Sequence, residues 1–339
     1  MTEAALHNLP ANSVALVTGA TGFTGQQLVR KLVAGGARVH AIARASSSRG
    51  ALAGLPVDWH IGDVFDPAVV SAALRGCTHL FHVAAAYRVA GLTDDVYRAV
   101  HVTSTQLLAE AAAATPGFQR FVHVSTVGVH GHIENPPATE EYPFHPGDIY
   151  QQTKAEAELW LRDFAPRRGL PFTVIRPAAI YGPGDLRLLK VFKMAAWPLF
   201  PILGHGRGLY HLIHVDDLAE VLILAAGHPA AAGQIFIAGN PEPTTLTGMA
   251  RTIAAALGRK IRIVHIPAGP VFLAADLCEA LCRPFGWRPP LHRRRVAFYT
   301  KDRAFDTAKL RTLLDCRMRY SNEQGLRQTA LWYREQGWI

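Results

Sequence analysis

Residues 17–32 read VTGATGFTGQQLVRKL, and this stretch decides the fold of the chain. It completes an apolar run at residues 13–19 that is typical of a buried strand, and it continues into a helical pattern. In that context Gly19 allows a tight turn, Gly22 lets the backbone approach a pyrophosphate, and Gly25 lets helix and strand pack closely. The helix start faces the phosphates with free N–H groups. The stretch therefore predicts a dinucleotide-binding loop.

Apolar runs alternate with helical patterns through the first half of the chain. This alternation is the signature of a parallel sheet covered by helices on both faces. The predicted fold class is α/β, a Rossmann-type doubly wound parallel sheet with a smaller C-terminal substrate lobe. The expected strands span residues 13–19, 37–43, 78–86, 120–126, 171–182 and 233–240. The expected helices span residues 26–36, 96–113, 151–165 and 216–227.

The predicted domain boundaries lie where this alternation breaks. Residues 183–210 mix proline, glycine, aromatic and basic residues without periodicity, as expected of an insertion that faces a substrate. After Asn240 come a helical run, a short strand and a basic helical tail. We expect a dinucleotide-binding Rossmann domain of residues 1–182, to which 211–240 return, and a substrate-binding lobe of residues 183–210 and 241–339.

The composition limits the class of protein. The chain has 339 residues, 49% of them hydrophobic, so it can bury a core without disulfides. Its four cysteines have no metal-ligand spacing, and no metal is expected. Prolines interrupt the apolar runs well short of a bilayer span, and no signal-peptide pattern is present. We predict a soluble, cytoplasmic protein without stable membrane insertion.

The formal net charge of +9 is concentrated late in the chain, notably in RPPLHRRR at residues 288–295. Such a segment could attract anionic lipid, nucleic acid or phosphate. No interleaving of aromatic and basic residues and no nucleic-acid motif accompanies it. A solvated surface is the favoured interpretation, and no nucleic-acid partner is expected.

The end of the second predicted strand, HAIARASSSR at residues 40–49, bears on the choice of cofactor. An NAD site usually places an acid there to bond the ribose hydroxyls. Ala43 occupies that position, and Arg44 follows it with three serines and a second arginine close behind. This set suits an additional phosphate, so NADP (NADPH) is favoured, with NAD as the alternative. Arg44 as an ordinary surface charge is the competing interpretation.

Residues 149–156, IYQQTKAE, place Tyr150 and Lys154 one helical turn apart. A tyrosine hydroxyl has a pKa of about 10, so it needs a nearby cation to exchange a proton at neutral pH. Lys154 could supply that field and also reach the ribose hydroxyls of a dinucleotide. Upstream, Ser125 and Thr126 end a predicted strand and offer a hydroxyl for a substrate oxygen. A chance pairing on an ordinary helix is the alternative.

In this order, these segments resemble the extended short-chain dehydrogenase/reductase superfamily, also called the NAD-dependent epimerase/dehydratase family. The resemblance covers nearly the whole chain, and the combination of motifs is specific for the superfamily but much less specific for the substrate. The matching segments are TGATGFTG, GDV at residues 62–64, HVAAA at 82–86, VSTVGVHG at 124–131, YQQTK at 150–154, RPAAIYGPGD from Arg176 and HLIHVDDLAE from His211.

The resemblance implies a role for individual residues. Tyr150 would be the acid/base, Lys154 its partner and ribose anchor, and Thr126 the group that orients the substrate oxygen, with Ser125 next in line. Asp63 would contact the adenine, although without the resemblance a helix cap would be the simpler interpretation of this residue. The implied cofactor contacts are Gly19, Thr21, Gly22, Phe23, Thr24, Gly25, Arg44, Asp63, Val64, Ala84, Ala85, Ala86, Tyr150, Lys154, Pro177 and Ile180.

One position departs from the family pattern. Many members carry an Asn in a VNxxGT helix motif, whereas this chain reads VHVTST at residues 100–105 and has His101 there. The family's Asn is thought to organise a proton-relay water. His101 either takes over that role or is a core histidine bonded to backbone, and both alternatives stay open.

Two classes of enzyme compete within the resemblance. Nucleotide-sugar epimerases and dehydratases keep NAD bound, and they need an acid after the second strand and basic residues for a diphosphate. The dihydroflavonol-reductase and 3β-hydroxysteroid-dehydrogenase branch instead transfers hydride between a free cofactor and an apolar ketone or secondary alcohol. The strand end at Arg44, the apolar insertion and the basic tail are similar to this second branch, which we favour. Arg187, Lys190, Lys193 and Arg207 could still clamp a diphosphate.

An apolar pocket with a few aromatic residues, for which Tyr87, Tyr142 and Tyr181 are candidates, would suit a sterol-like, flavonoid-like or 3-oxoacyl-like substrate. Each tyrosine could equally be a core or rim residue. A third alternative is a dinucleotide-binding regulator without turnover, which usually lacks the Tyr or the Lys; this chain has both. The resemblance also makes a homodimer conceivable, through helices near Val100 and Glu156.

Overall fold

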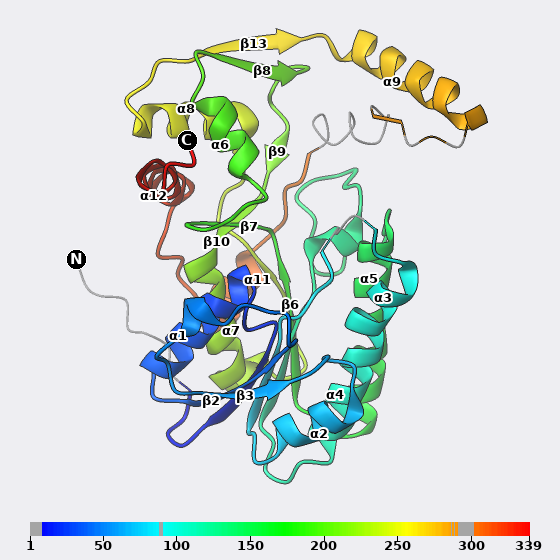
Figure 1. The fold of residues 1–339 in the computed structure, drawn as a ribbon, viewed down its shortest axis with the longest axis vertical. Helices are drawn as coiled ribbons and strands as arrows, with labels where there is room; N and C mark the ends of the chain where they lie inside the picture. Colours follow the sequence, from blue (N-terminus) through cyan, green and yellow to red (C-terminus); the bar gives the residue numbers. More distant parts are fainter. Residues whose placement is uncertain (1–8, 88–90, 286, 288, 291–301) are drawn as a thin grey trace.

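The computed structural model describes residues 9–87, 91–285, 287, 289–290 and 302–339 (Figure 1). Its centre is a seven-stranded sheet with the strand order β11-β6-β5-β4-β1-β2-β3, in which all neighbours are parallel. The strands are β1 (Val14–Thr18), β2 (Arg38–Ala43), β3 (Val57–Ile61), β4 (His79–His82), β5 (Arg120–Val124), β6 (Phe172–Pro177) and β11 (Ile235–Ala238). The order reverses at β1, so the predicted doubly wound Rossmann-type sheet is confirmed.

Helices cover both faces of the sheet, because successive residues of a strand point to opposite sides. Ala15 and Val17 of β1 belong to one apolar cluster, and Leu16 between them belongs to the other. The first cluster is closed by α1 (Phe23–Ala34), α7 (Val215–Gly227) and α11 (Ala308–Leu314). The second is closed by α2 (Pro67–Leu74), α4 (Ser104–Ala113) and α5 (Ile149–Arg167).

The helix predicted over residues 96–113 is divided into three parts. It consists of α3 (Asp94–Arg98), a π-helical turn η2 (Ala99–Thr103) and α4. A π turn adds a residue to the helical repeat, and such turns are frequent at functional sites. The widened turn contains His101, the residue that departs from the family pattern.

A second body lies above the sheet in the view of Figure 1 and holds its own apolar cluster, which includes Phe192, Phe200, Met249, Leu326 and Tyr333. Its strands are β8 (Leu199–Leu203), β9 (Leu209–Tyr210), β12 (Thr244–Thr245) and β13 (Arg262–Ile266). The parallel pair β7 (Ala179–Tyr181) and β10 (Leu212–His214) contributes to both bodies, with Tyr181 and Leu212 in this cluster and Ile180 and Ile213 in the cluster beneath α1 and α7. Its helices are α6 (Leu189–Ala195), α8 (Leu246–Ala256), α9 (Ala268–Cys282) and α12 (Asn322–Glu335). Short 3₁₀ turns are η1 (Gly50–Leu52), η3 (Val127–His130), η4 (Pro229–Ala231) and η5 (Arg283–Phe285).

The insertion and the C-terminal segments contribute to the same cluster, which supports the proposed substrate lobe. One part of the tail lies elsewhere. Leu310, Leu314 and Cys316 are buried in the cluster beneath α1 and α7, against the sheet. We therefore propose a division in which residues 308–316 belong with the Rossmann domain, because their apolar side chains fill its core and not that of the lobe.

Several chain-wide predictions have a structural outcome. The four cysteines are free thiols, as expected without a disulfide framework. Within the described part of the chain, no helix has the length and apolar character needed to cross a bilayer. Most of the basic segment at residues 288–295 lies outside the described residues, which include only Pro289 and Pro290 of it.

Candidate active site

The loop between β1 and α1 is shaped by glycine where no other residue would fit. Gly19 has a φ of +70°, and a Cβ there would lie 2.8 Å from the Cα and N atoms of Ala84. A Cβ on Gly25 would lie 2.1 Å from the carbonyl oxygen of Gly19. No side chain caps the start of α1 at Gly22, and no acidic residue occupies its first turn. The loop therefore leaves backbone N–H groups available to a pyrophosphate.

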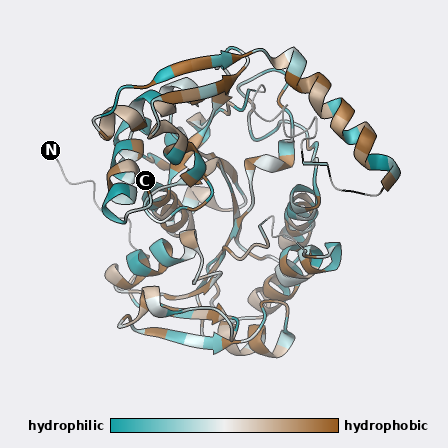
Figure 2. Ribbon diagram, turned by 45° about the horizontal axis from the view of Figure 1, so that its top comes forward, coloured by the Kyte–Doolittle hydropathy of each residue, from teal (hydrophilic) through white to brown (hydrophobic). Residues whose placement is uncertain are grey.

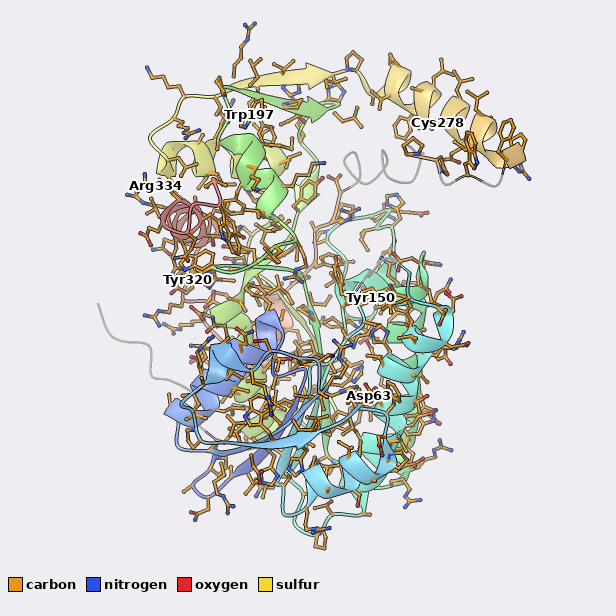
Figure 3. The ribbon with its side chains drawn as sticks, viewed as in Figure 1. Asp63, Tyr150, Trp197, Cys278, Tyr320 and Arg334 are labelled. Atoms are coloured by element: carbon orange, nitrogen blue, oxygen red, sulfur yellow. The ribbon has the colours of Figure 1, made fainter. Side chains whose placement is uncertain are left out.

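The ends of β2 and β3 lie side by side, because the amide of Gly62 donates to the carbonyl of Ala43 at 3.0 Å. Arg44 follows directly and is exposed. Asp63 is also exposed and lies just after β3 (Figure 3). The cap of α2 is Asp66, whose Oδ1 accepts from the amide of Ala68 at 2.8 Å. The helix-cap alternative for Asp63 is therefore wrong, and its side chain is exposed.

Lys154 lies in the second turn of α5, with only 1% of its surface exposed. Its Nζ donates a hydrogen bond to the carbonyl oxygen of Val124, the last residue of β5, at 2.5 Å. Burial lowers the pKa of Lys154 to about 8, and the carboxylate of Glu158, one turn further on, acts in the opposite direction. The amine is thus a buried charge that can be lost near neutral pH.

Tyr150 is the second residue of α5, and its ring is half-buried between two others (Figure 3). The ring meets Tyr87 edge-to-face, with centroids 5.1 Å apart and an interplanar angle of 83°. It meets the His101 ring in the same way, at 5.4 Å and 80°. These perpendicular contacts fix the direction of the phenol. Tyr87 is 42% exposed, so it lies on the solvent side of the Tyr150 ring.

The two candidate hydroxyls follow β5 immediately. Thr126 caps η3, and its Oγ1 accepts a hydrogen bond from the amide of Gly128 at 3.0 Å. Its own proton therefore remains free to be donated to another oxygen. Ser125 is only 3% exposed, and its Oγ has no hydrogen-bond partner among the described residues. A buried unpaired hydroxyl is unfavourable, so Ser125 fits a position that a ligand completes.

His101 connects two segments of the site through both ring nitrogens. Its Nε2 accepts from the amide of Ala86 at 3.0 Å, so we assign the ring proton to Nδ1, which donates to Thr153 Oγ1 at 2.7 Å. Burial, and then the charge of Lys154, lower the His101 pKa to about 2, so the ring is neutral. This geometry favours the alternative in which His101 is a core histidine over the one in which it relays protons.

A buried ion pair supports the face of α5 opposite the solvent. Arg176 Nη2 lies 2.5 Å from Glu158 Oε1, and both side chains are 0% exposed. Arg176 also donates from Nη1 to the carbonyl oxygen of Glu140 at 2.7 Å. Glu158 thus lies between two buried cations, because it also acts on the charge of Lys154. The i+4 spacing from Lys154 is the sequence signal that points to Glu158, which was not among the predicted site residues.

The sequence model of the NAD dependent epimerase/dehydratase family matches residues 15–239, which is more than half of the chain. The chain belongs to this family. The match spans the glycine loop, the hydroxyls after β5 and the start of α5, so the family predicted from the sequence motifs is confirmed. Membership makes a nicotinamide dinucleotide the expected cofactor, and the uncapped start of α1 and the close approach at Gly19 fit one.

Three relatives show the range of this family. Sterol demethylase protein B of Methylococcus capsulatus is 30% identical over 96% of this chain and 99% of its own length. The 4-hydroxy-2-methyl-3-oxo-4-farnesyl-3,4-dihydroquinoline-1-oxide ketoreductase of Stigmatella aurantiaca is 29% identical over 91% of this chain and 93% of its own. A UDP-glucose 4-epimerase of Mycolicibacterium smegmatis is 31% identical over 72% of this chain and 82% of its own.

The remaining contacts expected from the family lie in segments that follow the carboxyl ends of the sheet strands. Thr21, Phe23 and Thr24 are in the β1–α1 loop or the first turn of α1, Val64 and Ala85 follow β3 and β4, Pro177 ends β6, and Ile180 is in β7. Arg187 joins this group, because its guanidinium carbon lies 5.4 Å from the Phe23 ring centroid and 5.7 Å from that of Tyr87. From the sequence, Arg187 was a candidate only for a diphosphate clamp.

The three tyrosines proposed for the substrate pocket differ in position. Tyr87 contacts Tyr150, as described above. The Tyr142 hydroxyl accepts from the amide of Glu134 at 3.1 Å, in the long loop before α5. Tyr181 is 0% exposed and packs edge-to-face on His214 in the core of the lobe. A side chain without exposed surface does not offer a substrate contact, so Tyr181 is not part of the site that we propose below.

Proposed function

We propose that this protein is an NAD(P)-dependent oxidoreductase of the extended short-chain dehydrogenase type. It would interconvert a ketone and a secondary alcohol on an apolar, sterol-like, flavonoid-like or 3-oxoacyl-like substrate. The observation that carries this proposal is that the buried amine of Lys154, one helical turn after Tyr150 on α5, bonds the carbonyl of Val124, the residue directly before Ser125 and Thr126. These four side chains can hold a carbonyl oxygen and exchange a proton with it.

The cofactor proposed is NADP, with NAD as the alternative. Ala43 ends β2 without the acid that would bond ribose hydroxyls, and Arg44 is exposed next to it. A guanidinium at this position favours an additional phosphate, which it can bind with two parallel hydrogen bonds. The amide of Ser47 donates to the Arg44 carbonyl at 3.0 Å, and this turn keeps the serines close to the arginine.

In the proposed mechanism, the bound nicotinamide supplies or accepts the hydride. Thr126 donates its hydroxyl proton to the substrate oxygen and orients it, and Ser125 is the neighbouring candidate for this task. Tyr150 delivers a proton to that oxygen during reduction and removes it during oxidation. Lys154, one helical turn after Tyr150, supplies a positive charge that favours the phenolate, and it anchors the ribose. His101 and Tyr87 keep the Tyr150 ring in place through their edges.

The apolar nature of the substrate is supported by two relatives. One is named as a sterol demethylase protein and the other as a ketoreductase of a farnesylated quinoline oxide, and both align with more than nine tenths of this chain. These alignments include the C-terminal lobe, which would hold the substrate. The proposed pocket lies between Tyr87 and the insertion, with Tyr142 in the loop that leads to α5.

A nucleotide-sugar epimerase or dehydratase with tightly bound NAD is the second candidate. The UDP-glucose 4-epimerase relative favours it, as does Arg187, which lies over the aromatic ring that follows the glycine loop. The third candidate, a regulator that binds dinucleotide without turnover, has less support because Tyr150 and Lys154 are both present. A homodimer and a cytoplasmic location stay predictions.

The test is to measure NADPH oxidation with a panel of sterol ketones, flavonoids, 3-oxoacyl compounds and UDP-sugars. We expect stoichiometric NADPH consumption with at least one apolar ketone. Conversion of a UDP-sugar without net change in the cofactor would replace our proposal by the epimerase. Cofactor binding without turnover on the whole panel would favour the regulator.

A further inference from the structure

The lobe carries an unusual concentration of exposed apolar side chains. Fourteen large apolar or aromatic side chains in the described part of the chain are exposed, and nine of them lie between residues 197 and 287. These nine are Trp197, Leu199, Val264, Ile266, Leu273, Leu277, Leu281, Phe285 and Trp287. Solvent-exposed apolar residues are ordinarily scattered singly, whereas a concentration of this kind marks an interaction surface.

Helix α9 provides the most continuous part of this surface. Of its fifteen residues, only Ala275 is buried. Leu273, Leu277 and Leu281 follow one another at i+4 spacing on one side, and they are 62%, 55% and 70% exposed. Figure 1 shows α9 extending outward from the end of β13, and Figure 2 shows apolar residues along it. Phe285 and Trp287, 67% and 68% exposed, continue beyond its end.

The charge of the lobe indicates which kind of surface the exposed apolar side chains of α9 would bind. Residues 183–210 and 241–339 contain 21 Lys and Arg against nine Asp and Glu, a formal charge of +12. The rest of the chain contains 14 against 17, a charge of −3, which accounts for the +9 of the whole. Such asymmetry between two parts of one chain is typical of proteins that contact an anionic surface.

We propose that the α9 stripe, defined as Leu273, Leu277, Leu281, Phe285 and Trp287, docks the protein on an anionic lipid surface. Leucine and aromatic side chains of such a helix enter the boundary between headgroups and acyl chains, and the helix lies along the membrane without crossing it. The positive charge comes from the rest of the lobe, because the charged residues of α9 itself, Asp276 and Glu279, are acidic. The positive lobe supplies long-range attraction to anionic headgroups. This proposal rests on exposure and charge, independently of the proposed reaction.

The test is flotation of the full-length chain with lipid vesicles, in the absence of substrate and cofactor. We expect co-flotation with vesicles of phosphatidylcholine and phosphatidylglycerol, weaker binding to phosphatidylcholine alone, and release as the salt concentration rises. The double variant Leu277→Glu/Leu281→Glu should reduce the bound fraction at least about tenfold, because two apolar side chains can no longer be buried. Leu313→Glu, at an exposed leucine of α11, is the matched control.

Two outcomes would overturn the proposal. The first is that the wild-type chain does not float, or floats as well as the double variant. The second is a dimer, measured by light scattering without lipid, that dissociates in the double variant while no vesicle binding occurs; the stripe would then contact a second copy of the chain. Circular dichroism and the temperature of unfolding of the variants, measured separately in solution, show that they fold.

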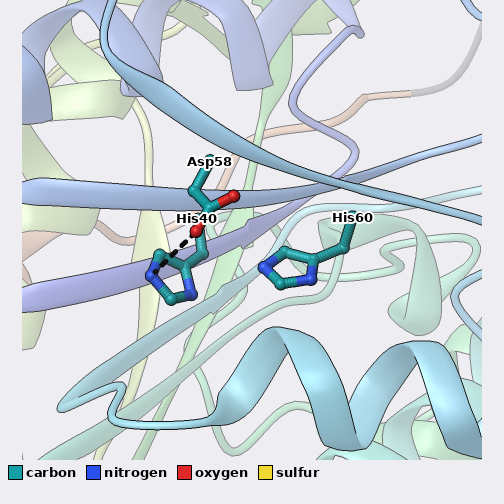
Figure 4. Close-up of side chains that lie close together, drawn as sticks. All are labelled: His40, Asp58 and His60. Carbon is teal, nitrogen blue, oxygen red and sulfur yellow. Dashed lines mark ion pairs between the residues drawn. The ribbon is translucent and has the colours of Figure 1, made fainter.

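A separate observation concerns three side chains on β2 and β3. His40 and Asp58 are paired across the two strands, and His60 lies two residues beyond Asp58, so all three share one face of the sheet. One ligand atom from each lies within 4.8 Å of the other two (Figure 4). His40 Nε2 and Asp58 Oδ2 are 3.8 Å apart. The cluster is at the sheet edge, because β3 is the outermost strand.

The hydrogen bonds of this cluster leave lone pairs directed into it. His40 Nδ1 lies 3.0 Å from the carbonyl oxygen of Ala73, which can only accept, so Nδ1 carries the proton and Nε2 has a free lone pair. His60 Nε2 is buried and has no hydrogen-bond partner among the described residues. Figure 4 shows the His60 ring turned toward His40 and Asp58. A histidine whose second nitrogen bonds a backbone carbonyl is the usual arrangement around a bound metal.

We propose that His40, Asp58 and His60 bind one divalent transition metal of the zinc type. Two imidazoles and a carboxylate suit zinc or cobalt better than magnesium or calcium, which prefer oxygen ligands. Water would complete the coordination, because the nearby Cys77 thiol already donates to the Ala73 carbonyl. The metal would connect the edge strand β3 to β2, just before Arg44 and Asp63.

The test uses protein without an affinity tag, titrated with Zn²⁺ by calorimetry and with Co²⁺ by visible absorption. We expect one equivalent to bind and the temperature of unfolding to rise with Zn²⁺. Asp58→Asn, at a side chain that is 68% exposed, and His60→Gln should each weaken binding at least about tenfold. His205→Ala, at an exposed histidine of the lobe, is the control. The proposal would be overturned if the wild type bound no metal, or if Asp58→Asn and His60→Gln bound it as tightly as the wild type does.

Discussion

The amine of Lys154 donates to the carbonyl oxygen of Val124 at 2.5 Å, and this bond joins helix α5 to strand β5. It holds the helix that carries Tyr150 against the strand that directly precedes Ser125 and Thr126. Because the amine is buried, the same bond keeps a charge in a place where charge is costly. The proposed function depends on that charge.

Cofactor affinity should decline as pH rises through about 8. Burial lowers the pKa of Lys154 to about 8, so the ammonium loses its proton above that pH and with it the attraction to the ribose hydroxyls and the field on Tyr150. The measurement is the dissociation constant of NADPH from about pH 6 to about pH 9.5, which is roughly the range over which the Lys154 amine titrates. Lys154→Gln should bind weakly at every pH, and unchanged affinity in that variant would remove the ribose-anchor role.

Arg44→Asp should shift preference from NADP toward NAD by about ten- to a hundredfold, because charge-assisted hydrogen bonds contribute about 1.5–3 kcal/mol. The measurement is the ratio of kcat/KM values for the two cofactors. Arg75→Asp makes the same charge change at an exposed position after α2 and should leave the ratio unaltered. If Arg44→Asp still binds NADP as tightly as the wild type, the proposed cofactor preference is wrong.

Glu158→Gln should lower the free energy of unfolding by about 3–5 kcal/mol, because it leaves the guanidinium of Arg176 buried without a counter-charge. Urea denaturation of the wild type and the variant measures this difference. The matched control is Glu156→Gln on the same helix, whose exposed ion pair with Arg98 should cost less than about 1 kcal/mol. Equal effects of the two substitutions would show that the buried pair contributes no more than the exposed one.

His101→Ala should weaken cofactor binding and turnover together, since the amide of Ala86 loses its acceptor and Thr153 loses its donor. Each unpaired group costs about 1–3 kcal/mol. His101→Asn should restore part of the activity, because an amide can both accept and donate. A neutral positioning histidine adds no step to the pH profile, so a limb of the profile that vanished in His101→Asn would indicate a proton relay instead.

The sequence was sufficient for the sheet, the glycine loop and the family, because these depend on local patterns. Alternating apolar runs determine the strands, and the steric limits at Gly19 and Gly25 act over a few residues. Features that depend on tertiary packing could not be predicted. Examples are the bonds of His101 to two separate segments, the complete burial of Tyr181, and the exposure of α9, whose apolar residues a sequence would assign to a core.

The cap of helix α2 is a feature that a local sequence signal could have predicted. Asp63 and Asp66 both precede α2, and either could cap a helix by residue type. The amides of Ala68 and Val69 donate to Asp66, because Pro67 sets the first helical position directly after it. The presence of a proline at that position was the local signal that would have distinguished the two aspartates.

The most direct test of the central claim is the Tyr150→Phe variant, assayed for NADPH-dependent reduction of whichever ketone the wild type accepts. Removal of the hydroxyl should lower kcat about 10²- to 10⁴-fold, the range for loss of a positioned acid, and leave the dissociation constant of NADPH within about twofold. Turnover that stays within about tenfold of the wild type would contradict Tyr150 as the acid/base and, with it, the proposed mechanism.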